Sequence, residues 1–227
     1  MAPAIRILHF SDVLCVWAFV SQVRIDELRS SFGRDIDVDV RFCTVFGNAR
    51  GKLEGSWADR GGLRGYGAHV REVVSRFDHV DVHPEVWASL CPASSLSCHQ
   101  WLCAVRHLER SGALDPSEGN YQQACWLLRE AFFRELRDVS QRGVQLELAE
   151  QLSIPRAGLE RCLDDGIAHA ELAEDMLLVR EHDVKMSPTL ILDEGRQRLN
   201  GNVGYRVIDA NVRELLRQPE GDTASWC

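Results

Sequence analysis

The sequence has no Cys-x-x-Cys pair, although it contains eight cysteines. Structural zinc sites and dithiol redox motifs are commonly built on that spacing, so neither is indicated, and we predict that no metal or other cofactor is bound. A chain of 227 residues can bury a core without covalent staples, so we expect free thiols rather than disulfides. Four cysteines lie in helical patterns, where a free cysteine behaves as a small hydrophobe.

The sequence also lacks a long hydrophobic run, a cationic leader and an excess of positive charge. No window approaches the length of about 18 apolar residues that a membrane span needs, and no cationic segment precedes an apolar run at the N-terminus. The net charge is −8, with Lys and Arg scattered among Asp and Glu. We therefore expect a soluble, cytoplasmic protein that binds neither membranes nor nucleic acid.

Residues 5–42 have the pattern of a strand, a helix and a second strand. Apolar residues at 5–10 predict a buried strand, and a helical pattern follows with Val20, Val23 and Leu28 on one side, ended by Gly33. Residues 36–42 alternate between apolar and charged side chains, which predicts a strand with one face in water. A connection of this length makes the two strands parallel.

The rest of the chain is rich in helical patterns. Residues 47–67 have weak periodicity and indicate a loop or a short helix. Helices are predicted over 101–108, 121–136, 144–152 and 156–163, the last with Pro155 at its first position. A helix over 169–182, a strand over 189–192, a turn, a short antiparallel strand at 197–199 and a helix over 205–216 with Val207 facing inward complete the pattern.

This order, βαβ, then helices, then αββα, predicts an α/β protein: a thioredoxin fold with an all-helical insertion between its two halves. The first half, with the active-site loop, is expected in residues 1–90 and the insertion in 91–166. The second half is expected in 167–217, and 218–227 is expected to be a flexible tail.

Cys15 lies between the first strand and the first helix. The helix N-terminus favours an anion, so we expect the pKa of this thiol to fall below the usual value of about 8.5, giving a nucleophilic thiolate. Trp17, in the same turn, would shield it from bulk water. The alternative is that Cys15 is only a small apolar residue at the junction.

Ser187-Pro188 precedes a strand in the second half of the chain. In this fold a proline entering a strand is commonly cis, and the turn packs against the active-site cysteine, so we expect a cis bond close to Cys15. The alternative is a trans proline that starts the strand.

Four segments resemble motifs of the DsbA-like thioredoxin-fold family that includes FrnE, 2-hydroxychromene-2-carboxylate isomerase and the kappa-class glutathione transferases. S-D-V-L-C-V-W-A-F at 11–19 is similar to that family's S-D-x-x-C-P-W-C-Y, and S-S-L-S-C-H at 94–99 to its N-[ST]-x-x-A-H. A-F-F at 131–133 with R-D-V-S at 137–140, and M-S-P-T at 186–189, resemble its A-F-F…D-[IV]-S and V-P-[ST] runs. We predict Cys15 as the catalytic residue, with these active-site neighbours: Ser11, Asp12, Trp17, Ala18, Cys43, His99, Ser187, Pro188 and Thr189.

Two departures from the family pattern bear on activity. Ala18 stands where the family has its resolving cysteine, and Val16 replaces the intervening proline. A single thiol can hold a mixed disulfide, but two thiols are needed to carry and transfer an internal disulfide. Cys43, at the end of the second strand, is either a resolving thiol brought to the same sheet edge or a buried strand-end residue.

Other residues leave two interpretations open. His99 either orients a substrate or is capped into its own helix start. The cations of the 47–67 segment either clamp a carboxylate of glutathione or are solvated: Arg50, Lys52, Arg60 and Arg64.

Three functions follow from these patterns. The first is a thiol oxidoreductase that works by monothiol exchange at Cys15, with a small thiol such as glutathione or a protein thiol as its partner. The second is a glutathione-dependent transferase or isomerase, since such relatives use one hydroxyl or thiol at this position. The third is a non-catalytic binding module of the same fold. Glutathione would act as co-substrate in the first two, and a homodimer is also compatible with the sequence.

Overall fold

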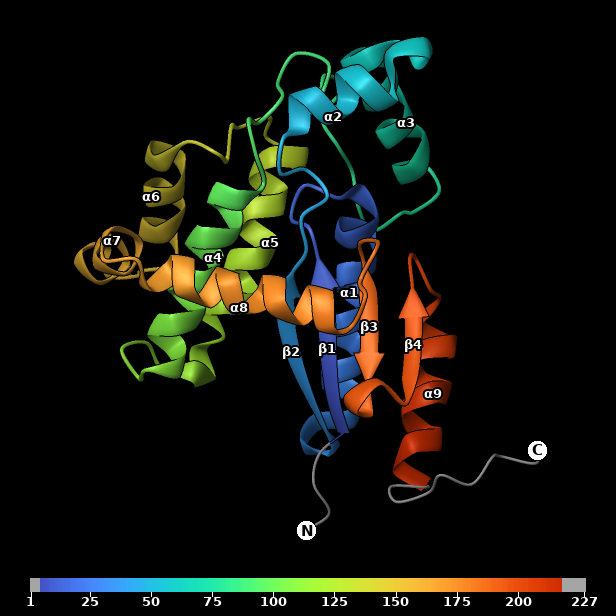
Figure 1. Cartoon of the computed structure of the whole chain (residues 1–227), viewed down its shortest axis with the longest axis vertical. Helices are drawn as coiled ribbons and strands as arrows, with labels where there is room; N and C mark the ends of the chain where they lie inside the picture. Colours follow the sequence, from blue (N-terminus) through green and yellow to red (C-terminus); the bar gives the residue numbers. More distant parts are fainter. Residues whose placement is uncertain (1–4, 218–227) are drawn as a thin grey trace.

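A computed structural model describes residues 5–217 and shows a four-stranded mixed sheet with helices on both faces (Figure 1). The sheet order is β2-β1-β3-β4. β2 runs parallel to β1, whereas β3 is antiparallel to both β1 and β4. The strands are β1 (Ile5–Ser11), β2 (Ile36–Phe42), β3 (Thr189–Leu192) and β4 (Gln197–Asn200). The predicted α/β thioredoxin-type order is confirmed, and the predicted tail at 218–227 lies outside the described residues.

The alternation of side chains along β1 explains why both faces of the sheet are covered. Ile5 and Ile7 pack with apolar residues of α1 (Val16–Phe32) and α9 (Tyr205–Arg217). Leu8 and Phe10 point to the other face, where residues from α8 (Ile167–Glu181) cover them. A strand buried on both faces carries apolar residues on both, as Ile5, Ile7, Leu8 and Phe10 do, although Arg6 between them is exposed.

The helical region lies between β2 and α8. Two helices, α2 (Ala49–Ser56) and α3 (Gly62–Val74), lie beyond the end of the sheet where α1 begins (Figure 1). The others lie to one side of the sheet: α4 (Leu96–Arg110), α5 (Asn120–Phe133), α6 (Arg142–Gln151) and α7 (Arg156–Asp164). Short 3-10 turns occur at Gly33–Asp35, Ala58–Arg60, Pro116–Glu118 and Asp193–Gly195. Residues 47–67 are therefore mostly helical, more so than their weak periodicity indicates.

Three details of the predicted pattern are wrong. Val23 and Val207 are 39% and 49% exposed, because the buried stripes of their helices run through Ile25 and Leu28, and through Ile208, Val212 and Leu215. Pro155 is the N-cap residue of α7 rather than its first helical residue.

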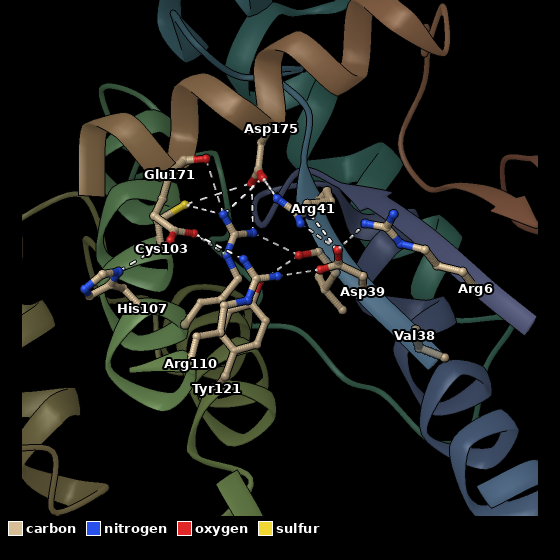
Figure 2. A network of polar contacts seen from close by, with 12 residues as sticks. Arg6, Val38, Asp39, Arg41, Cys103, His107, Arg110, Tyr121, Glu171 and Asp175 are labelled. Carbon is tan, nitrogen blue, oxygen red and sulfur yellow. Dashed lines mark hydrogen bonds and ion pairs between the residues drawn. The ribbon is translucent and has the colours of Figure 1, made fainter. Parts of the chain in front are cut away.

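The third detail concerns Arg41. The alternating pattern of β2 predicts that it faces water, but the residue is buried and only 6% exposed. It donates to Asp175 of α8 at 3.0 Å, and Arg106 of α4 donates to the same carboxylate at 3.0 Å (Figure 2). The Phe42 N–H also donates to Asp175, at 3.1 Å. This buried network ties α4 of the insertion and α8 of the second half to β2. Removing one partner of such a network typically costs about 3–5 kcal/mol.

Candidate active site

Cys15 is the N-cap residue of α1. Its backbone is extended, with φ −82° and ψ 119°, and its carbonyl accepts the first helical hydrogen bond from the Phe19 N–H at 3.0 Å. A turn precedes it, closed by the Cys15 N–H donating to Asp12 O at 3.0 Å. The side chain is 6% exposed, and its Sγ donates to the carbonyl oxygen of Ser187 at 3.3 Å. The structure therefore places Cys15 at the helix N-terminus, as predicted, against the loop that contains Pro188.

That loop is held at several points. The Ser187–Pro188 bond is cis, the geometry expected from the sequence. Ser187 Oγ accepts the Asp12 N–H at 2.9 Å, and Thr189 Oγ1 lies 3.0 Å from Met186 O and 3.2 Å from Asn200 Oδ1. The loop and the Cys15 turn are thus joined by two hydrogen bonds, both accepted by Ser187.

Asp12 is a fully buried carboxylate that organises the surroundings of Cys15. Oδ2 accepts from Val45 N and Phe46 N, both at 2.8 Å, and from Ser95 Oγ at 2.8 Å. Oδ1 accepts from Leu14 N at 2.9 Å. One side chain therefore connects the Cys15 turn, the loop after β2 and the start of α4.

His99 lies beneath the same turn. Its Nε2 accepts the Val13 N–H at 3.2 Å and is 3.7 Å from Asp12 Oδ1, while its ring stacks on Phe42 at 4.6 Å between centroids. Burial lowers the pKa of His99, outweighing the neighbouring carboxylates of Asp12 and Asp175 that raise it. Ser95 occupies the N-cap position of α4, and the His99 N–H donates to its carbonyl oxygen at 2.9 Å. His99 is thus built into the start of its own helix, while its ring supports the Val13 amide.

The expected depression of the Cys15 pKa is wrong in direction. Burial raises the pKa of the thiol, and the Asp12 carboxylate raises it further. Hydrogen bonds from the Ser187 side chain and from the backbone N–H groups of Ala18 and Trp17 act the other way but are outweighed. The helix N-terminus does favour the thiolate, as expected, yet desolvation dominates.

A buried cation behind the site was not predicted. Arg129 of α5 is 3% exposed; its guanidinium donates to Ser11 Oγ at 3.0 Å and to Gln22 Oε1. Burial lowers the pKa of Arg129, while Cys125, Cys15 and Asp12 raise it. Among the described residues, no carboxylate forms an ion pair with this guanidinium. The available signal was an arginine within an otherwise apolar helical stripe of α5.

The remaining predicted neighbours lie around the same turn. Ala18 is fully buried, and Trp17 is half-buried against the core. Cys43 is buried, with its Sγ 4.0 Å from Met186 O. Burial raises the pKa of Cys43, and the nearby Asp12 and Cys15 raise it further.

Most cations of the 47–67 segment are engaged locally. Arg50 pairs with Glu54 at 3.2 Å, Lys52 lies over the Phe46 ring at 5.3 Å, and Arg60 lies over Trp57 at 3.9 Å. These contacts favour the interpretation of a helix surface over that of a preformed carboxylate clamp.

Within residues 5–217, no cluster of three His, Cys, Asp or Glu side chains is arranged to hold a metal ion. The seven cysteines in this range are free thiols. No helix in the same range is both long and apolar enough to cross a bilayer.

No family model matches the sequence, and a search of curated proteins gives no match. Solved structures do match. A proposed protein disulfide isomerase of Nitrosomonas europaea has a TM-score of 0.71 at 13% identity, covering 96% of this chain and 100% of that one. The cytosolic disulfide reductase DsbM of Pseudomonas aeruginosa has a TM-score of 0.68 at 18% identity, covering 92% and 99%. A 2-hydroxychromene-2-carboxylate isomerase has a TM-score of 0.59 at 15% identity, covering 96% and 100%. At these identities the similarity establishes the DsbA-like thioredoxin fold.

Proposed function

We propose that this protein is a thiol oxidoreductase that exchanges a single thiol, Cys15, with glutathione or with protein thiols. The observation that carries the proposal is the 3.3 Å contact between Cys15 Sγ, at the start of α1, and Ser187 O of the cis-proline loop. The similar DsbM has also been solved with GSH, at a TM-score of 0.61 and 19% identity. A thiol tripeptide therefore suits this fold, and a cytoplasmic location suits a monothiol site.

The exchange needs no external cofactor. The Cys15 thiolate attacks one sulfur of a disulfide, the substrate S–S bond breaks, and the departing thiolate takes up the proton that Cys15 has lost. A mixed disulfide then remains on Cys15 until a second thiol attacks it. The N–H groups of Trp17 and Ala18, which lower the pKa of Cys15, would stabilise the sulfur charge in both steps.

Intact-protein mass spectrometry after incubation with glutathione disulfide tests the proposal. The parent protein should gain a glutathione adduct that reductant removes and that peptide mapping places at Cys15. Cys15→Ser should gain no adduct at this position. If the folded parent forms neither a glutathione adduct nor a disulfide at Cys15, thiol exchange is contradicted and a non-catalytic binding module is favoured.

One observation favours a glutathione-dependent transferase or isomerase as the second candidate. Ala18 supplies no second thiol. The solved structure of a 2-hydroxychromene-2-carboxylate isomerase also has this fold. In that case the protein should bind glutathione non-covalently and convert an electrophilic acceptor in its presence. Turnover of an electrophile without disulfide exchange would favour this candidate over the oxidoreductase.

A further inference from the structure

Two thiols border the same loop. Cys15 Sγ lies 3.3 Å from Ser187 O, and Cys43 Sγ lies 4.0 Å from the preceding carbonyl, Met186 O. The position of Cys43 is fixed by the sheet, because its N–H donates to Ser11 O at 3.2 Å, directly after the last paired residues of β1 and β2. Parallel strands that end at one edge have therefore brought a second sulfur to the same Met186–Ser187 segment.

Ser187 acts on both sulfurs. Its Oγ accepts the Asp12 N–H at 2.9 Å, its carbonyl oxygen accepts from the Cys15 thiol at 3.3 Å, and its side chain acts to lower the pKa of Cys15 and of Cys43. The two cysteines are also close enough for the Cys15 thiolate to disfavour ionisation of Cys43. A negative charge on the Cys15 sulfur therefore raises the pKa of Cys43.

Cys43 has its own approach from solvent. It lines a pocket of about 210 Å³ between the end of β2, α8 and the loop before Pro188, together with Thr44, Met176 and Met186. Cys98, in contrast, is fully buried in α4, and its Sγ contacts Val139 O at 3.3 Å. Cys98 therefore resembles Cys43 in contacting a carbonyl oxygen, but it lies against a different segment.

We propose that Cys43 is the resolving thiol of this site and replaces the thiol that Ala18 does not supply. This inference rests on the proposed function, since a mixed disulfide must first form on Cys15. The Cys43 thiolate then attacks Cys15 Sγ, the bond from Cys15 to the glutathione sulfur breaks, and glutathione leaves as a thiolate that takes up the Cys43 proton. In total, one glutathione disulfide is reduced to two glutathione molecules, while two protein thiols become one disulfide.

The charges of the two thiols are coupled. While Cys15 is ionised, its charge opposes ionisation of Cys43. Once Cys15 is capped as a mixed disulfide it carries no charge, and that opposition ends. Closing the bond requires the two sulfurs to approach to about 2.05 Å.

A time course with glutathione disulfide, followed by intact mass and peptide mapping, tests this inference. The parent should form the adduct transiently and convert to a species that has lost two hydrogens, with the peptides of Cys15 and Cys43 linked. In Cys43→Ser the conversion should be lost and the adduct should persist until reductant is added. Cys98→Ser is the matched control and should convert like the parent, and Cys43→Ala repeats the test should the serine variant fold poorly.

The two proposals fail in different ways. An adduct that persists in the parent as long as in Cys43→Ser, or that still converts in Cys43→Ser, overturns the role of Cys43 and leaves monothiol exchange intact. Absence of both a Cys15 adduct and a Cys15–Cys43 disulfide in the parent, together with no adduct at Cys15 in Cys43→Ser, overturns the proposed function itself.

Discussion

The sulfur of Cys15 lies 3.3 Å from the carbonyl oxygen of Ser187, although the two residues are 172 positions apart in the chain. The contact joins the first helix to the loop before β3, so it exists only when both halves of the fold are assembled. Chemistry at Cys15 should therefore be sensitive to the local structure of both halves.

The reactivity of Cys15 should rise steeply with pH. Because burial raises the pKa of this thiol, its thiolate fraction is small at neutral pH and increases about tenfold per pH unit until that pKa is reached. Site-resolved alkylation rates should therefore keep rising beyond the usual thiol value of about 8.5. A plateau at lower pH would show that the helix N-terminus outweighs burial.

Ala18→Cys should give the protein a conventional dithiol motif. Ala18 is fully buried one turn into α1, so the added sulfur costs stability, expected to be under about 1.5 kcal/mol for modest overpacking. The variant should reduce insulin faster than the parent. Ala18→Ser adds a hydroxyl in place of a thiol and should leave activity unchanged. An inert, folded Ala18→Cys would show that a second thiol at this position does not speed the exchange.

Asp12→Asn should separate the structural and electrostatic roles of this carboxylate. The amide cannot accept from all four donors, so the free energy of unfolding should fall by about 1–3 kcal/mol. Loss of the negative charge should at the same time lower the pKa of Cys15. Ser95→Ala removes one donor and keeps the charge, so in urea unfolding and alkylation profiles it should lose stability without shifting the Cys15 pKa.

His9 should make the protein sensitive to mild acid. Burial, followed by the charges of Arg129 and Arg29, lowers the pKa of His9 to about 3, whereas an unfolded chain has a histidine pKa of about 6.5. The unfolded state therefore binds a proton that the folded state does not. The contribution of neutral His9 to the free energy of unfolding is complete above about pH 6.5. It is lost by about 1.4 kcal/mol per pH unit as the pH falls towards 3.

Urea unfolding at two pH values measures this effect. When the pH falls from about 7 to 5, the free energy of unfolding of the parent should decrease by about 2 kcal/mol more than that of His9→Gln, which has no titrating ring. Equal losses in the two proteins would mean that His9 is accessible to protons in the folded state.

The sequence predicted the parts of the site that depend on local pattern. Cys15 at a strand–helix junction and Ser187-Pro188 at a strand start are short-range features, and the DsbA-like motifs place them in one fold. The direction of the Cys15 pKa was missed because burial is a property of the assembled protein: Tyr66 of α3, more than 50 residues away in the sequence, is close enough to feel the charge of Cys15. Arg41 and Arg129 were missed for the same reason, since their partners Asp175 and Ser11 are 134 and 118 residues distant.

The most direct test of the account is a crystal structure of the Cys43→Ser variant after treatment with glutathione disulfide. The account predicts a glutathionyl group bonded to Cys15 Sγ and lying against the Met186–Ser187 segment, with the thiol of Cys91 unmodified. Cys91 is the least buried of the cysteines between residues 5 and 217, so it reports simple accessibility. Glutathione on Cys91 with an unmodified Cys15 would contradict the central claim that Cys15 is the reacting thiol.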